Sequence, residues 1–337
     1  IIEKSLRARK INYIIFDDVN SEPTTEYVEG GLQIYKQNNC DFIIAFGGGS
    51  PIDTAKAISL MINNPGSISD YKGLGKVKRK GIMLVAIPTT SGTGSEVTPF
   101  TIIGDIKSNI KMLIGSPYII PDVAILDPVL TLSCPKGLTA SVGIDALTHA
   151  IEAYVSVKAN PMSDIFALSA IKLISSDLET AYSDSENTKA RENIMLGAME
   201  AGIAFGNSSV ALVHGMSRPI GAYFHIPHGV SNAALLAVVM DYSYIGEIDR
   251  YSMITSVMGE DISKMDKKAA ARKSVQLVRK MISKLNIPKL SQLGVDEEKL
   301  KELAPLMAEA AIESGSPSNN PKQATKEEII DLYLKAY

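Results

Sequence analysis

The pattern of the sequence changes near residue 131, and this change limits the folds that the chain can adopt. From residue 11 to about 130, short runs rich in β-branched and aromatic residues alternate with helical patterns. Such alternation predicts a parallel sheet wrapped by helices. After residue 131, one helical pattern follows another without a convincing strand. We therefore expect a Rossmann-like α/β domain over residues 1–131 and an all-helical domain over residues 132–337.

The expected elements follow from the spacing of apolar residues. In the first domain we expect helices at residues 25–37 and 51–63, and strands at residues 11–16, 41–46, 82–87, 100–103, 112–114 and 123–126. In the second domain, Thr131 is expected to cap the first helix, with Pro135 near its opening turn. Further helices are expected at residues 160–182, 187–204, 230–258 and 264–285.

The composition excludes several classes of protein. A net charge of −3 argues against a nucleic-acid surface, which is normally basic. No apolar stretch reaches the ~18 residues that a membrane-spanning helix needs. Only Cys40 and Cys134 occur, without a Cys-x-x-Cys pair, so a reducing cytoplasm is the expected location.

A glycine-rich junction joins the second expected strand to a helix. Gly47, Gly48 and Gly49 allow the backbone to turn sharply and to bring its N–H groups close to a ligand. Ser50 is a candidate N-cap, and Asp53 stands at the spacing of a capping box. We expect a phosphate here, although a tight turn before a well-capped helix is the simpler alternative. The usual dinucleotide fingerprint is absent.

A second polar loop, residues 88–96, follows the strand expected at 82–87. Loops after the carboxyl ends of parallel strands line the ligand crevice of an open sheet, so this loop and the glycine loop are expected to face the same ligand. Its hydroxyl groups suit ribose and phosphate contacts. A turn-rich linker without a ligand is an equally good interpretation of the loop alone.

One helix presents a carboxylate and an imidazole together. Asp145 and His149 are four residues apart, so they share a face of an otherwise apolar helix. A buried Asp and a buried His both need a partner. The two side chains can bind one ion together. On the evidence of this pair alone, a plain hydrogen bond between them is slightly favoured over a metal site.

Three of the four histidines lie within fifteen residues, in a stretch rich in Gly and Pro. If His214 and His228 lie on adjacent elements, they complete a set of one carboxylate and three imidazoles. Such mixed ligands suit Fe²⁺, Zn²⁺ or another first-row divalent ion, and ligand type does not choose among these. His225 is expected to be a surface or hydrogen-bonded histidine.

These stretches resemble the iron-containing alcohol dehydrogenase family, which includes lactaldehyde, propanediol and butanol dehydrogenases. The resemblance extends in order over nearly the whole chain, through residues 47–56, 87–97, 143–154, 214–229 and 320–322. It implies a dehydroquinate synthase-like architecture and an enzyme that uses NAD or NADP.

The resemblance also implies roles for single residues. Asp145, His149, His214 and His228 fall on the family's metal ligands. The cofactor positions are Gly47, Gly48, Gly49, Ser50, Asp53, Thr89, Thr90, Thr93 and Lys111. Phe205 falls on an aromatic residue of the substrate pocket.

The sequence departs from the family at two positions of this pocket. Arg218 stands where some members have a second histidine, which takes part in proton relay, so an anionic or more polar substrate is conceivable. Ser316 stands where some members have cysteine. Family members also begin with a further strand–helix unit, so we expect a segment on the order of 30 residues to be missing before residue 1.

We therefore expect a metal-dependent, NAD(P)-linked dehydrogenase for a small primary alcohol or diol and its aldehyde. The ion acts as a Lewis acid, no side chain acts as a nucleophile, and the enzyme is a homodimer or larger homo-oligomer. One alternative is a metal- and NAD-dependent lyase of the dehydroquinate synthase type. Another is a non-catalytic helical scaffold.

Overall fold

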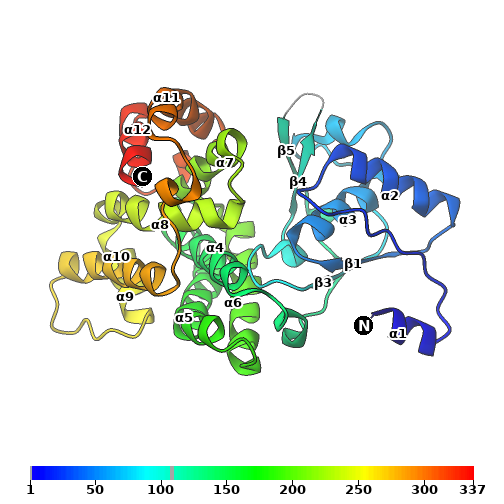
Figure 1. Ribbon diagram of the computed structural model, residues 1–337, viewed down its shortest axis with the longest axis horizontal. Helices are drawn as coiled ribbons and strands as arrows, with labels where there is room; N and C mark the ends of the chain where they lie inside the picture. Colours follow the sequence, from blue (N-terminus) through cyan, green and yellow to red (C-terminus); the bar gives the residue numbers. More distant parts are fainter. Residues whose placement is uncertain (1, 107–109) are drawn as a thin grey trace. The chain divides into compact units, whose positions relative to one another are not determined.

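The computed structural model describes residues 2–106 and 110–337, and the chain divides into two compact units (Figure 1). The first unit comprises Ile1–Thr89 and Ser95–Leu126. The second comprises Thr90–Gly94 and Asp127–Tyr337.

The first unit contains a parallel sheet packed against a helix. Strands β1 (Ile43–Gly47), β3 (Leu84–Pro88) and β6 (Val123–Ala124) are parallel and adjacent in the order β1-β3-β6. Helix α3 (Gly49–Asn63) follows β1 directly and packs on this sheet. Ile52 and Ala55 of α3 are buried against Ala45, Leu84 and Ala86 of the strands. Helix α2 (Thr25–Gln37), predicted with the same bounds, packs beside α3.

A second sheet in the first unit differs from the prediction. It has the order β2-β5-β4, with β2 (Gly73–Leu74) parallel to β5 (Ile110–Gly115) and β4 (Phe100–Asp105) antiparallel to β5. The strands expected at residues 100–103 and 112–114 are therefore present, but they pair with each other. They do so because the chain between them is too short for the crossover that parallel neighbours need.

The prediction of a strand at residues 11–16 is wrong. These residues form no strand, and the side chains of Ile14 and Ile15 are 54% and 51% exposed. Only Phe16 packs against the core beneath α2 and α3. β-Propensity measures how well a side chain fits a pleated surface, and in the described structure no neighbouring strand pairs with these residues. The short helix α1 (Ile2–Ala8) precedes them and has no buried residue.

The predicted caps of two helices are also wrong. Helix α3 has Gly48 as its N-cap without a side-chain hydrogen bond, so Ser50 lies within the helix. The carboxylate of Asp53 accepts hydrogen bonds from Ser95 Oγ and from the backbone N–H of Ile102 instead of capping the helix. In the second unit, Thr131 lies in a 3₁₀ turn, and α4 (Lys136–Val155) begins after Pro135.

The second unit is helical throughout its described residues, as predicted. Helix α4 is followed by α5 (Pro161–Ser183), α6 (Thr188–Ser208), α7 (Leu212–Phe224), α8 (His228–Ser243), α9 (Ile248–Val257), α10 (Lys267–Lys284), α11 (Glu297–Glu313) and α12 (Lys326–Lys335). The single helix predicted at residues 230–258 is two helices, α8 and α9. A 3₁₀ turn separates them, at Gly246, where a side chain would meet the backbone of Pro321 and Lys322.

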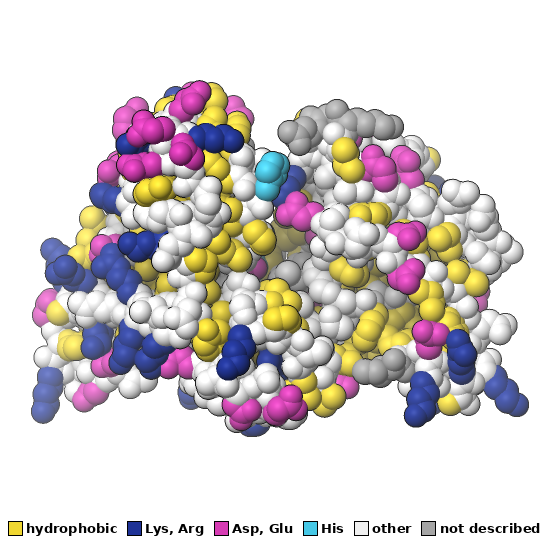
Figure 2. Space-filling view, viewed as in Figure 1, with side chains coloured by type: hydrophobic (Ala, Val, Ile, Leu, Met, Phe, Trp, Pro, Cys, Tyr) yellow, Lys and Arg dark blue, Asp and Glu magenta, His cyan; other side chains and the backbone are white. Residues whose placement is uncertain are grey.

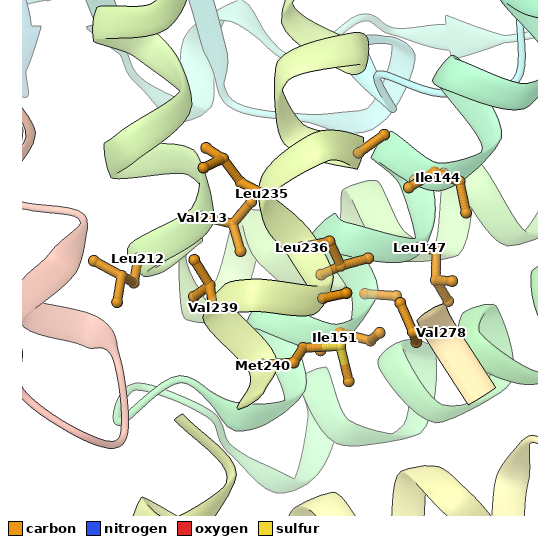
Figure 3. Packing of buried hydrophobic residues seen from close by; sticks show 14 of the residues in the cluster. Ile144, Leu147, Ile151, Leu212, Val213, Leu235, Leu236, Val239, Met240 and Val278 are labelled. Atoms are coloured by element: carbon orange, nitrogen blue, oxygen red, sulfur yellow. The ribbon is translucent and has the colours of Figure 1, made fainter. Parts of the chain in front are cut away.

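Helix α4 lies at the centre of this unit. It is buried almost along its whole length, as expected of a helix that is apolar on every side. Figure 3 shows Ile144, Leu147 and Ile151 of α4 beside side chains of α8 and α10. Any polar side chain on α4 is therefore held out of water.

Helix α10, in contrast to α4, is an amphipathic helix at the surface. Ala270, Ala271, Val275 and Val278 are buried, and the remaining faces carry lysine and arginine. Figure 2 shows basic side chains gathered over the part of the unit where α9 and α10 lie. Several of these side chains are neutralised by acidic neighbours, as in the pairs Lys267–Asp249 and Arg279–Asp241.

Among the described residues, no single helix is long and apolar enough to cross a membrane. Taken together, α6 and α7 are long and apolar enough by length and composition, but the two helices meet at a bend of 104°.

Candidate metal centre

Two carboxylates and one imidazole lie along one face of α4. Asp145, His149 and Glu152 are spaced by four and three residues, which places them on the same helix face. All three are buried, with exposed fractions of 3%, 6% and 3%. Polar groups held this far from water need partners, which come from α7 and α8.

The start of α7 supplies His214 and is itself held by Glu152. No side chain of the local sequence caps α7. Instead, the Glu152 carboxylate accepts hydrogen bonds from the backbone N–H groups of Ala211 (2.9 Å) and Val213 (2.5 Å). Oε2 of Glu152 also lies 2.6 Å from Nδ1 of His214. A carboxylate at a helix N-terminus is stabilised by the unpaired N–H groups and by the helix dipole. The same contact fixes the orientation of the His214 ring.

The start of α8 supplies His228. This residue is the first of α8, after Pro227. Ser217 Oγ lies 3.3 Å from His228 Nδ1 and 2.6 Å from Ser231 Oγ, so a small hydroxyl cluster lies against the imidazole. One turn further along α8, Nδ2 of Asn232 lies 3.1 Å from His228 Nε2.

The structure brings three of the four predicted ligands together directly. One ligand atom each of Asp145, His149 and His214 lies within 4.8 Å of the others. The rings of His149 and His214 are stacked, with their centroids 4.4 Å apart. His228 is not in this group of three, but its ring centroid lies 5.3 Å from that of His214. Nδ2 of Asn232 contacts His228, His214 and Asp145, the last at 2.6 Å, so His228 shares one neighbour with two members of this group.

Burial shifts every titratable group of this cluster toward its neutral form. It lowers the pKa of His149 to about 4 and that of His228 to about 3. It also lowers the pKa of His214 well below its ordinary value, and the charge of Arg218 adds to this effect. In the opposite direction, it raises the pKa of Asp145 and brings that of Glu152 to about 7. The imidazoles are therefore neutral at pH 7, which is the form that binds metals.

These residues fit a divalent cation. Nδ1 of His149 is buried and has no hydrogen-bond partner, so a nitrogen lone pair or proton is left unsatisfied inside the protein. Burial makes the charged carboxylates unfavourable, and a nearby cation reverses this cost. Neutral imidazole nitrogens with a carboxylate oxygen are the ligand types of Fe²⁺ and Zn²⁺.

The three predicted pocket residues lie in the same unit. Phe205 of α6 stacks on His149, with ring centroids 4.4 Å apart. Nη1 of Arg218 donates a hydrogen bond to Ser316 Oγ at 2.9 Å. Arg218 is one turn after His214 on α7. His225, expected to lie at the surface, is exposed and ends α7 in a left-handed conformation.

The predicted phosphate loop lies in the first unit, at the carboxyl end of β1. Gly47 has a φ of +152°, and a side chain there would lie 2.6 Å from the ring of Pro51, so only glycine fits. Gly47 pairs with Pro88 of β3, and the N–H of Thr89 donates to the carbonyl of Gly47. The glycine loop and the start of the second polar loop are thus adjacent.

The other predicted cofactor residues are divided between the two units. Thr90 and Thr93 belong to the short segment that groups with the helical unit, where a side chain on Gly92 would meet Val142 of α4. Lys111 lies on β5, and its Nζ forms an ion pair with Glu22 at 2.6 Å.

Sequence reasoning missed Glu152 and Asn232. A signal for Glu152 was present, because it lies three residues after His149 on a helix that is otherwise apolar. Asn232 carries a weaker signal of the same kind, four residues after His228. The role of each depends on how α7 and α8 pack against α4, which the sequence does not show.

Comparison with known proteins supports the resemblance that the sequence showed. Residues 1–128 match a family described as iron-containing alcohol dehydrogenase, and residues 139–337 match the C-terminal part of the Fe-containing alcohol dehydrogenase family. The chain is 36% identical to an NAD-dependent methanol dehydrogenase of Bacillus methanolicus, over 99% of this chain and 87% of that protein. It is 35% identical to lactaldehyde reductase of Escherichia coli, over 100% and 87% of the two chains.

A solved structure of a 1,3-propanediol oxidoreductase superposes with a TM-score of 0.96 at 36% identity, over 99% of this chain and 87% of that one. The likeness therefore extends over both units and over the helices that carry Asp145, His149, His214 and His228. The chain belongs to the iron-containing alcohol dehydrogenase family of oxidoreductases.

Proposed function

We propose that this protein interconverts a small primary alcohol or diol and its aldehyde, with Asp145, His149, His214 and His228 holding a divalent ion. Fe²⁺ is the ion that the family name favours, and Zn²⁺ suits the same ligands. The substrate class follows the relatives, which include a methanol dehydrogenase, a 1,3-propanediol dehydrogenase and a lactaldehyde reductase.

One observation carries the proposal. A buried carboxylate and two buried imidazoles converge within 4.8 Å, and one ring nitrogen among them, His149 Nδ1, has no hydrogen-bond partner. A purely structural cluster of this kind is expected to satisfy its own polar atoms, since each unsatisfied buried group costs about 1–3 kcal/mol. A cation accounts for both the convergence and the unpaired nitrogen.

The residues of the chain orient and shield the reacting groups. When bound, a divalent ion polarises the substrate oxygen, and a nicotinamide exchanges a hydride with the substrate carbon. Glu152 holds the His214 ring through Nδ1, so Nε2 is the ring nitrogen on the side of Asp145 and Asn232 and would be the ligand atom. Phe205 covers one face of His149 and keeps water from that side. Oxidation of the alcohol also releases a proton, and Arg218 cannot relay it because a guanidinium stays protonated.

The glycine loop supports the nicotinamide cofactor in this proposal. Gly47, Gly48, Gly49 and Ser50 lie where α3 begins, and the free N–H groups and dipole of a helix N-terminus favour a phosphate. Thr89 is hydrogen-bonded to this loop and can contribute its hydroxyl to the same ligand. The remaining proposed cofactor contacts are Asp53, Thr90, Thr93 and Lys111. The proposed cofactor is either NAD or NADP.

Elemental analysis combined with a substrate assay tests the proposal. The purified protein should hold about one iron or zinc ion per chain. It should reduce NAD⁺ or NADP⁺ with at least one of methanol, 1,2-propanediol and 1,3-propanediol, and His214→Ala should lose both metal and turnover while keeping its circular dichroism. An active, metal-free His214→Ala protein would end the proposal.

The chain offers a matched control for this experiment. His225 is an exposed histidine on the same helix, and its left-handed backbone conformation tolerates asparagine. His225→Asn should keep the metal and the turnover of the unchanged protein. A homo-oligomer and a cytoplasmic location are also part of the proposal, and sedimentation of the purified protein tests the first of these.

A further inference from the structure

Arg218 carries a charge that the described structure leaves without an anionic partner. Its guanidinium is part-buried, and the hydrogen bond to Ser316 Oγ is made with a neutral hydroxyl. No carboxylate of the described residues forms an ion pair with it. Burial lowers the pKa of Arg218, because loss of water disfavours the charged guanidinium. Buried charges in proteins are normally paired.

The nearest acidic group is already occupied. Glu152 interacts favourably with Arg218 at longer range. Both oxygens of Glu152, however, accept hydrogen bonds from the start of α7, and Oε2 also contacts His214. No ion pair or hydrogen bond joins this carboxylate to the guanidinium in the described structure, because its oxygens are directed at α7.

Arg218 lies close to the proposed ligands. It follows His214 by one turn on α7, and its positive charge acts on His214 and His228. An anion bound beside the guanidinium would pair with this charge.

We propose that the substrate carries an anionic group, a carboxylate or a sulfonate, which Arg218 binds while the aldehyde or alcohol end lies at the metal centre. The inference rests on the proposed function, because it deepens the substrate class of the same site. A planar guanidinium with several free N–H groups suits such oxyanions, and the bond to Ser316 fixes its direction. Hydride and proton transfer are unchanged, since the anionic group takes no part in the reaction.

Matched pairs of aldehydes test this proposal. Glyoxylate, succinate semialdehyde and glutarate semialdehyde are compared with acetaldehyde, butanal and pentanal, in the direction that oxidises NADH or NADPH. At least one anionic aldehyde should have a higher kcat/KM than its neutral counterpart. Arg218→Gln should lower that kcat/KM by about tenfold to a hundredfold, mainly through KM, because a charge-assisted hydrogen bond is lost. Turnover of the neutral aldehydes should change much less.

Two further variants separate charge from position. Arg218→Lys keeps the charge without the planar fork and should recover part of the lost selectivity. Arg272 is an exposed arginine of α10. Arg272→Gln removes the same charge from the surface and should leave the ratio of anionic to neutral turnover unchanged.

A binding measurement gives a readout that does not depend on turnover. Propane-1-sulfonate, a weak ligand for metals, is titrated into the metal-loaded protein in a calorimeter and compared with the neutral propane-1-sulfonamide. The sulfonate should bind more tightly, and Arg218→Gln should remove the difference while its thermal unfolding stays cooperative. Arg218→Lys serves as the folded comparison if the glutamine variant unfolds.

The outcomes separate the two proposals. If the protein turns over only neutral aldehydes, or if Arg218→Gln lowers the turnover of both classes alike, the anionic substrate is wrong and the proposed function stands. If no aldehyde or alcohol of either class is turned over by the metal-loaded protein, the proposed function fails. Equal binding of sulfonate by the unchanged protein and Arg218→Gln also overturns the role of Arg218.

Discussion

Glu152 Oε2 lies 2.6 Å from Nδ1 of His214, and the same carboxylate caps the helix on which His214 stands. One side chain of α4 therefore sets both the position of α7 and the direction of a proposed ligand. Such partners of ligating histidines fix ring orientation and raise ligand basicity.

Replacement of Glu152 should weaken metal binding without removing a ligand. Glu152→Gln keeps an oxygen that can accept one N–H of α7 but loses the charge beside His214. We expect metal affinity to fall about tenfold to a hundredfold. Competition with a chelator, followed by elemental analysis, measures the change.

Glu302 provides the control for this variant. It is an exposed acid on α11, in the same unit. Glu302→Gln should hold metal as tightly as the unchanged protein. If Glu152→Gln does so as well, the carboxylate does not act through His214.

Stability of the chelator-treated protein should depend on pH through His149. Burial lowers the pKa of this residue to about 4, below the ordinary histidine value of 6.5. Between these values the unfolded chain binds a proton that the folded chain does not, so the free energy of unfolding falls as pH is lowered. The slope from one such group is at most about 1.4 kcal/mol per pH unit.

A variant of His149 separates its contribution to this pH dependence from the contributions of neighbouring titratable groups. Glu152, whose pKa is raised to about 7, acts in the opposite direction: its contribution is present below pH 4.5 and is lost as pH rises through 7. His149→Phe keeps an aromatic ring against Phe205 but cannot titrate. Urea unfolding between pH 4.5 and 7 should give a shallower acid decline for this variant. Parallel curves for the two proteins would contradict the assignment.

Part of the site could be predicted because it is local in sequence. Asp145 and His149 lie on one helix, and the spacing of four residues brings them together in any α-helix. The apolar residues between them show that this helix is buried. The helical second unit followed from the same periodicity.

The rest depends on tertiary packing. Glu152 and His214 are 62 residues apart, and Arg218 and Ser316 are 98 residues apart, so neither contact has a local signal. The division of residues 230–258 into α8 and α9 depends on backbone that passes close to Gly246. Likewise, residues 11–16 have side chains that favour a strand, but in the described structure no neighbouring strand pairs with them.

The loop that packs against Val142 of α4 should tolerate no side chain at Gly92. A β-carbon there would lie 2.7 Å from Val142 Cβ and 2.9 Å from the carbonyl oxygen of Val142. Gly92→Ala should lower the free energy of unfolding by about 1–3 kcal/mol through overpacking. Urea unfolding measures this loss, and elemental analysis should show reduced metal content.

Gly137 is the matched control, because nothing lies within 4 Å of an added β-carbon there. It is an exposed residue of the first turn of α4. Gly137→Ala should be neutral or stabilising by up to about 1 kcal/mol, since alanine favours helices. Equal losses in both variants would show that steric overlap is not the cause.

A buried lysine should be the strongest single determinant of stability in the first unit. Lys56 is fully buried, and its Nζ donates to Thr98 O (2.9 Å), Thr98 Oγ1 (3.1 Å) and Phe100 O (2.8 Å). Burial lowers its pKa to about 8, while Asp53 and Glu96 favour the charged form. The three bonds join α3 to β4 and to the residues just before it.

Lys56→Met removes the cation but keeps the length of the side chain. Three buried oxygens and two buried carboxylates then lose their partner, which should cost roughly 3–5 kcal/mol. Lys36 of α2 is exposed, and Lys36→Met should change the free energy of unfolding by less than about 0.5 kcal/mol. Urea unfolding of the two variants gives both values. A loss below 1 kcal/mol for Lys56→Met would mean that the oxygens find water or new partners, and that the lysine does not hold these elements together.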